Sequence, residues 1–147
     1  MISHAQEYYH ATSLKDALKK LGKNGEHVPV PVTGAFHLIA GKLRAATCLV
    51  DISAVGLDTI SVAGKKVTIG GTATFQQIVK SKELPEVVRK SAQAYSTIIQ
   101  RNTTTLQDAL FGYATYFDLM TALLAFDTQV KVQGKTKCVV PDRKSVV

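Results

Sequence analysis

The sequence predicts an α+β protein with two lobes: a small N-terminal lobe of βαβ type and a second lobe that combines helices with a mostly antiparallel sheet. The 147 residues are 46% apolar and 20% charged, which is enough apolar side chain for a packed core. Strand-like and helix-like segments alternate in the first third, and a hairpin pattern follows them. We place the lobes at residues 1–53 and 54–141.

The N-terminal lobe is predicted from three short segments. Residues 13–23, SLKDALKKLGK, repeat apolar side chains at helical spacing and end at a glycine. Ser13 and Asp16 give this helix a start that resembles a capping box. EHVPVPV at 26–32 is extended, because proline disfavours helical backbone in the residue before it. TCLVDIS at 47–53 is typical of a short buried strand.

The remaining elements are predicted in the same way. FHLIAGKLR at 36–44 is a candidate short helix, and TISVAGKKVTIG at 59–70 is a hairpin that turns at Gly64. YFDLMTALLAF at 116–126 predicts an apolar helix, and DTQVKVQGKTKCVV at 127–140 predicts a closing hairpin.

One long helix is predicted over residues 84–99, with Pro85 in its first turn. Its inner face is expected to carry the apolar side chains of Val87, Val88, Tyr95, Ile98 and Ile99.

Charge and composition exclude several classes of protein. The net charge is +7, but Lys and Arg exceed the acids by a similar margin in each third of the chain. A nucleic-acid reader usually gathers its charge on one face, so we expect no nucleic-acid partner. No apolar run approaches the ~20 residues of a membrane span, and the N-terminus lacks the apolar core of a signal peptide. We therefore expect a cytoplasmic protein without a membrane span.

Metal and catalytic motifs are missing from the sequence. Cys48 and Cys138 do not form a Cys-x-x-Cys pair, lie in apolar contexts and are expected to be buried thiols. The four histidines lack metal-ligand spacing, and the scattered carboxylates form no acid–base pair. The sequence also contains no phosphate-loop motif and no nucleophile motif. We accordingly name no catalytic residue and no metal ligand.

Two polar turns remain as candidates for a binding site. VTGAFHL at 32–38 runs from a strand into a helix through Thr33-Gly34-Ala35, and NTTTLQDA at 102–109 is a polar turn after a helix. A turn at a helix start exposes backbone N–H groups, which suits a phosphate, and two such turns can hold the two phosphates of a dinucleotide. The alternative is that both are ordinary turns.

A series of motifs in the chain, taken in order, resembles the FAD-binding subunit of the molybdenum hydroxylases, the family of the xanthine dehydrogenase and carbon monoxide dehydrogenase medium subunits. The motifs keep near-constant spacing from about residue 9 to residue 134. They are ATSLKDAL at 11–18, VTGAFH at 32–37, LVDIS at 49–53, IGGTAT at 69–74, QRNTTTLQDA at 100–109, and Asp118-Leu119 followed by ALLAFDT at 122–128.

This resemblance implies a two-lobed fold with FAD between the lobes. It also implies two partners, a large subunit with the molybdenum cofactor and a small subunit with 2Fe–2S clusters. The flavin would pass electrons between those clusters and an external acceptor, which makes the chain an oxidoreductase component. The matching cofactor-binding positions are Val32, Thr33, Gly34, Ala35, Phe36, Thr105, Gln107, Asp108, Ala109 and Asp118.

The chain departs from the family pattern at these turns. The family has Gly-Gly-Thr-Asp where this chain has Thr33-Gly34-Ala35-Phe36, and Gly-Gly-Asn where it has Gln107-Asp108-Ala109. Glycine lets the backbone approach a pyrophosphate, and Gln107 brings a side chain into that space. An Asp108 carboxylate about 5 Å from a phosphate, at an effective dielectric constant of about 20, would repel it by roughly 3 kcal/mol.

The sequence leaves three hypotheses open. The first is the flavin-carrying electron-transfer subunit, with FAD weakened or lost, and the second is a subunit of the same fold that lacks tight FAD and serves assembly or interaction. The third, a basic nucleic-acid or acidic-partner module, rests on net charge alone. The last six residues, 142–147, match a translated sequencing adaptor, and we expect a non-native or truncated tail there.

Overall fold

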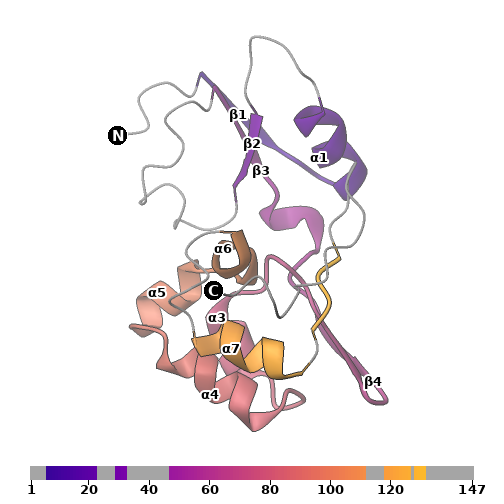
Figure 1. The fold of residues 1–147 in the computed structure, drawn as a ribbon. Coiled ribbons are helices and arrows are strands. Elements are labelled where there is room, and N and C mark those ends of the chain that lie inside the picture. The colour runs from indigo at the N-terminus through magenta and orange to yellow at the C-terminus, as the bar shows by residue number, and fades with distance from the viewer. Residues whose placement is uncertain (1–5, 23–28, 33–46, 112–117, 127, 132–147) are drawn as a thin grey trace.

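The computed structural model describes residues 6–22, 29–32, 47–111, 118–126 and 128–131. Its elements form two lobes, one above the other in Figure 1, with α6 (Leu106–Phe111) beside the region where they meet. The α+β class predicted from the sequence is confirmed. The predicted helix at 36–44, nearly all of the closing hairpin, Cys138 and the tail lie outside the described residues.

The first lobe is built on a three-stranded parallel sheet. Its order is β1-β3-β2, with β1 at Glu7–His10, β2 at Pro29–Val32 and β3 at Cys48–Asp51. His10 and Val32 are both aligned with Asp51, so the three strands end in one row. The predicted extended segment is confirmed over its described residues, 29–32, and so is the buried strand. The row of strand ends faces the second lobe (Figure 1).

Helix α1 (Leu14–Leu21) covers this sheet, and its ends follow the sequence prediction. Ser13 is the N-cap and accepts a hydrogen bond from the backbone N–H of Asp16, while Gly22 is the C-cap. Ala17 packs into a small core with residues of β3, and Cys48 is buried there as a free thiol. The prediction of a buried thiol is confirmed for Cys48.

The second lobe combines one antiparallel hairpin with a group of helices. β4 (Ile60–Ala63) pairs with β5 (Lys66–Ile69), and the turn between them places Gly64 at φ +61°. The left-handed φ explains the glycine at this turn. The helices are α3 at Phe75–Lys80, α4 at Glu86–Ala94, α5 at Ile98–Thr103, α6 at Leu106–Phe111 and α7 at Asp118–Ala125.

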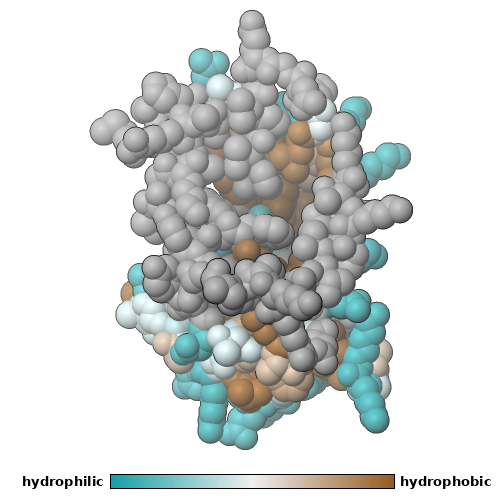
Figure 2. Space-filling model, viewed as in Figure 1, coloured by the Kyte–Doolittle hydropathy of each residue, from teal (hydrophilic) through white to brown (hydrophobic). Residues whose placement is uncertain are grey.

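A separate apolar core holds the second lobe together. Phe75 and Ile78 of α3 and Leu119 of α7 are fully buried in it. Tyr95 packs its ring against Phe75 at a centroid distance of 4.8 Å. The cores of the two lobes are distinct clusters, and the boundary at 53/54 stays a prediction. Figure 2 shows apolar atoms in a hollow at the middle of the molecule and hydrophilic side chains along the outer edge of the lower lobe.

The predicted long helix over residues 84–99 is wrong in its second half. Helix α4 ends at Ala94, Ser96 adopts φ +42°, and α5 begins at Ile98 with Thr97 as its N-cap. Three side chains assigned to the inner face are exposed instead: Val87 by 51%, Ile98 by 55% and Ile99 by 73%. Val88 is buried and Tyr95 is partly buried, as expected.

Arg101 stabilises the interruption between α4 and α5. Its Nη1 donates to the carbonyl oxygens of Gln93, Tyr95 and Ser96 at 3.2, 3.1 and 2.7 Å, and its Nε donates to Gln76 Oε1 at 3.1 Å. The last carbonyls of a helix lack helical partners, so a guanidinium that binds them favours an end at this position.

Helix α7 confirms the predicted apolar helix, which starts at Asp118. Among the described residues, no helix is both long and apolar enough to cross a membrane.

Candidate functional site

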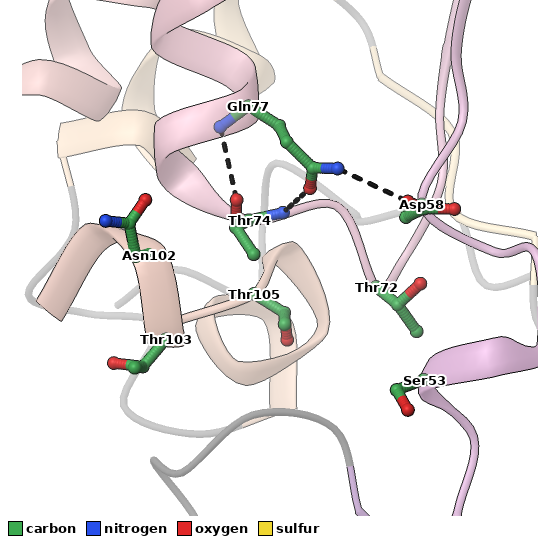
Figure 3. Close-up of a pocket in the computed structure, with 8 residues that line it drawn as sticks. All are labelled: Ser53, Asp58, Thr72, Thr74, Gln77, Asn102, Thr103 and Thr105. Atoms are coloured by element: carbon green, nitrogen blue, oxygen red, sulfur yellow. Dashed lines mark hydrogen bonds between the residues drawn. The ribbon is translucent and has the colours of Figure 1, made fainter. Parts of the chain in front are cut away.

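A polar pocket of about 380 Å³ lies between the start of α6 and the end of the first lobe (Figure 3). Four threonines, at positions 72, 74, 103 and 105, line it together with Ser53, Asp58, Gln77 and Asn102. Ser53 belongs to the short 3-10 helix at Ser53–Val55, which directly follows the sheet. Every side chain on the described wall therefore carries a hydroxyl, amide or carboxylate group, and Asp58 is the one ionisable side chain among them.

Gly70 fixes the side of the pocket that carries Asp58 and Thr72. A Cβ on Gly70 would lie 2.0 Å from the carbonyl oxygen of Leu57, so no side chain can be accommodated there. The close approach brings two backbone bonds, Gly70 N–H to Thr59 O at 2.8 Å and Thr72 N–H to Leu57 O at 3.0 Å. The glycine thus holds the loop after β5 against the loop before β4.

Thr74 and Gln77 form a complete capping box at the start of α3. The Thr74 N–H donates to Gln77 Oε1 at 2.7 Å, and the Gln77 N–H donates to Thr74 Oγ1 at 3.2 Å. The other end of the Gln77 amide donates to Asp58 Oδ2 at 3.3 Å, as Figure 3 shows. One side chain therefore closes the helix start and positions the pocket carboxylate.

The segment 71–75 pairs with the segment 104–107 across the pocket. Phe75 N–H donates to Thr104 O at 3.0 Å, and Thr74 and Thr105 form an antiparallel bridge. Two further bonds join Leu106 N–H to Ala73 O at 2.9 Å and Gln107 N–H to Gly71 O at 2.7 Å. These three backbone hydrogen bonds join the start of α3 to the start of α6.

Asp108 closes the start of α6 with a second box. Its Oδ2 accepts from both the N–H and the Oγ1 of Thr105 at 2.8 Å, and its own N–H donates to Thr105 Oγ1 at 3.3 Å. The Asp108 side chain is fully buried. A carboxylate in the first turn of a helix also interacts favourably with the helix dipole.

The structure corrects the predicted turn at residues 102–109. Gln107, Asp108 and Ala109 lie inside α6, because Thr105 and Asp108 supply the hydrogen bonds that a helix start needs. The carboxylate expected to face a phosphate is instead turned onto Thr105.

The N–H groups at this helix start do not fit a pyrophosphate. The N–H groups of residues 105–109 all donate to oxygens of the chain itself, at 2.7–3.3 Å. A phosphate bound by helix N–H groups needs donors that are not already used. The backbone N–H groups of residues 105–109 are therefore not free to bind a phosphate.

Asp51 organises the edge of the first lobe next to Ser53. It accepts hydrogen bonds from the Tyr8 hydroxyl, from His10 Nδ1 at 3.2 Å and from the Ser53 N–H at 2.9 Å. Burial by itself would raise the pKa of Asp51, but the hydrogen bonds from Tyr8, Ser53 and His10 together outweigh it and lower the pKa to about 2. The carboxylate is therefore ionised at neutral pH.

The predicted site residues are distributed unevenly around this pocket. Thr105 lines it, and Val32 is buried at the end of β2, in register with Asp51. The four residues 33–36 lie outside the described part of the chain. Asp118 is the first residue of α7 and is exposed, but it is not among the residues that line the pocket.

Several pocket residues were not predicted as site residues. Thr72 and Thr74 lie in the IGGTAT motif, and Asn102 and Thr103 lie in the NTTT segment, so both motifs contained the signal. Nothing in the sequence distinguished Asp58, which reaches the pocket through the contact at Gly70. Among the described residues, no cluster of three or more His, Cys, Asp or Glu side chains could hold a metal ion.

Comparison with known families gives a match over nearly the whole chain. The family model described as the FAD binding domain in molybdopterin dehydrogenase matches residues 3–141. A comparison with curated proteins found no match.

Solved structures share this fold. A reconstituted CO dehydrogenase from Oligotropha carboxidovorans is 27% identical over 74% of this chain, with a TM-score of 0.65. CO dehydrogenase from Hydrogenophaga pseudoflava is 25% identical over 75%, with a TM-score of 0.66. Quinoline 2-oxidoreductase from Pseudomonas putida 86, at 22% identity over 74% and a TM-score of 0.63, is similar in fold alone. The chain spans 40% of each of the two CO dehydrogenase chains and 39% of the third.

Proposed function

Because the chain belongs to the family of FAD binding domains in molybdopterin dehydrogenases, we propose that it is a component of a molybdenum-containing hydroxylase or dehydrogenase complex. Its partners would be a large subunit with the molybdenum cofactor and a small subunit with 2Fe–2S clusters. Within that complex, we propose that it acts as an assembly or interaction subunit that does not hold FAD tightly. A cytoplasmic location stays a prediction.

The contact between Asp108 and Thr105 is the observation that favours a subunit without tightly bound FAD. A family member that binds a pyrophosphate at α6 needs backbone donors there, and the buried Asp108 carboxylate already accepts the Thr105 N–H and hydroxyl at 2.8 Å. A phosphate would have to displace an acceptor that is covalently part of the helix. It would also bring negative charge next to a buried carboxylate, which weakens binding further.

The electron-transfer flavoprotein is the second candidate, and one observation favours it. Asp118 keeps its position in an exposed first turn of α7, where the resemblance places a residue that holds the flavin nucleotide. A bound flavin would supply the transfer of electrons between the clusters and an external acceptor. This chain would contribute residues 32–36, Thr105 and Asp118 to binding. It would then be the oxidoreductase component that the resemblance implies.

Bound flavin in the purified chain separates the two candidates. The full chain would be produced in cells supplied with riboflavin, and its visible flavin absorbance would be compared with its protein content. We expect far less than one flavin per chain, since the phosphate donors of α6 are used internally. A stoichiometric amount of FAD that survives gel filtration would refute the assembly role. In that case Asp118→Ala should lower the FAD content, while the free energy of unfolding falls by no more than the ~0.5–1 kcal/mol expected from the helix dipole.

A further inference from the structure

We propose that the pocket beside Thr105 binds an uncharged, hydroxyl-rich ligand of nucleoside or riboflavin size and discriminates against the phosphorylated forms of that ligand. Such selectivity rests on the proposed function, because it applies to a chain that does not retain FAD.

The size and lining of the pocket fit this class of ligand. Its volume of about 380 Å³ lies near the lower end of the ~300–1,000 Å³ range of ligand pockets. A threonine hydroxyl can both donate and accept hydrogen bonds, and the amide of Asn102 adds a further donor and acceptor. Ligand hydroxyl groups, which also do both, can pair with such a wall in several orientations.

Thr72 supplies a second and independent observation. Its hydroxyl oxygen is buried and has no hydrogen-bond partner among the described residues, although the residue lines the pocket. Figure 3 shows Thr72 between Asp58 and Ser53. An unpaired buried hydroxyl costs free energy, and a ligand hydroxyl that bonds to it would remove that cost. The pocket therefore holds a polar atom whose hydrogen-bonding capacity is still available.

The carboxylate of Asp58 should make the pocket favour neutral ligands over phosphorylated ones. Asp58 is the ionisable side chain on the described wall, and Gln77 holds it in place at 3.3 Å. A phosphate in the pocket would meet this carboxylate at close range. The nearby N–H groups at the start of α6 cannot offset the repulsion, because each of them donates to an oxygen of the chain. A neutral ligand avoids the repulsion.

Riboflavin and FMN test the charge argument, because they differ by one phosphate. The full chain, freed of any flavin, would be titrated with each and followed by quenching of flavin fluorescence. We expect riboflavin to bind at least tenfold more tightly than FMN. Equal binding, tighter binding of FMN or no binding of riboflavin would each overturn the proposal.

Two variants assign the effect to named atoms. Thr72→Val removes the unpaired hydroxyl with little change in shape, so riboflavin affinity should fall at least fivefold while the melting temperature rises or stays equal. Thr68→Val on the exposed strand β5 is the matched control and should change neither. Asp58→Asn should reduce the ratio of riboflavin to FMN affinity at least threefold. An unchanged ratio, or a Thr72→Val variant that binds riboflavin as well as the wild type, would overturn the proposal.

The two levels of inference fail in different ways. FAD that stays bound at one per chain through purification would refute the assembly role. A flavin-free chain that ignores riboflavin would leave that role intact and refute only the neutral-ligand pocket.

Discussion

Asp51 and Asp108 hold opposite sides of the pocket through the same contact, since each accepts the backbone N–H of a residue that lines it. Asp51 binds Ser53 N–H at 2.9 Å, and Asp108 binds Thr105 N–H at 2.8 Å. Their reach differs. Asp51 also joins Tyr8 and His10 of a neighbouring strand, and Asp108 also accepts a hydrogen bond from the Thr105 hydroxyl in its own helical turn.

The comparison of Asp51 with Asp108 separates contacts between residues close in sequence from contacts that need the tertiary fold. The contact of Asp108 with Thr105 joins residues three positions apart, and backbone hydrogen bonds to residues 71–75 also hold this segment. The contact of Asp51 with Ser53 joins residues two positions apart, but the contacts of Asp51 with Tyr8 and His10 join strands more than forty residues apart, so they form only when the parallel sheet is assembled. Substitutions should therefore act on the two sides with different strengths.

The largest expected effect is from Asp108→Ala. It leaves the buried Thr105 N–H and hydroxyl without this acceptor, and we expect a loss of about 2–3 kcal/mol in the free energy of unfolding. Denaturant unfolding measures it. Asp118→Ala is the matched control, because it removes a carboxylate from an exposed first turn, where the helix dipole accounts for about 0.5–1 kcal/mol at most. Equal losses would show that burial of the box is unimportant.

Acid should act mainly on the Asp51 side. Because the pKa of Asp51 in the folded protein, about 2, lies below the ordinary value of 3.8, ionised Asp51 stabilises the fold above pH 4, and this contribution is lost as pH falls from about 4 to about 2. The shift corresponds to roughly 2 kcal/mol. As the pH is lowered from 5 to 2, the free energy of unfolding should fall more steeply for the wild type than for Asp51→Asn. Parallel curves would contradict the assignment.

Tyr8→Phe isolates the inter-strand part of the Asp51 cluster. It removes one hydrogen bond from an exposed tyrosine, so we expect a loss of about 0.5–1 kcal/mol at neutral pH. The pKa of Asp51 should rise toward its ordinary value, which NMR titration of the carboxyl carbon can follow. A pKa that stays at its wild-type value would assign its depression to Ser53 and His10 alone.

The smallest effect is expected from Gln77→Ala at the neighbouring helix start. This neutral box lies at the surface, and its loss should cost about 0.5–1 kcal/mol. Thermal unfolding measures the change, with Gln100→Ala in α5 as an exposed glutamine for comparison. A loss as large as that of Asp108→Ala would remove the distinction between the exposed and the buried box.

The sequence predicted the local features of this molecule well. Ser13 at the start of α1, the turn at Gly64 and Asp118 at the start of α7 all follow from short patterns with a direct physical cause. The end of α4 was missed because it depends on Arg101, whose guanidinium folds back onto carbonyls that precede it by up to eight residues.

The candidate site was predicted only in part, for a related reason. The NTTT and IGGTAT motifs pointed to the correct segments, but the pairing of residues 71–75 with 104–107 is a tertiary contact. Asp108 was interpreted as a charge beside a phosphate, although its spacing from Thr105 also matches a capping box. Asp58 reaches the pocket because Gly70 packs closely against the backbone of Leu57. A Cβ at position 70 would lie only 2.0 Å from the carbonyl oxygen of Leu57, and no local sequence pattern predicts this contact.

The contact at Gly70 also makes the hairpin a separable appendage. Gly70 N–H donates a hydrogen bond to Thr59 O at 2.8 Å, which closes the base of the hairpin, while β4 and β5 project away from the rest of the lobe (Figure 1). Residues inserted at the Gly64 tip would lie beyond this closed base, and each doubling of the length of a flexible loop costs only about 0.6 kcal/mol. The tip is thus a natural graft point for an epitope or a fluorescent reporter, at a distance from the pocket walls.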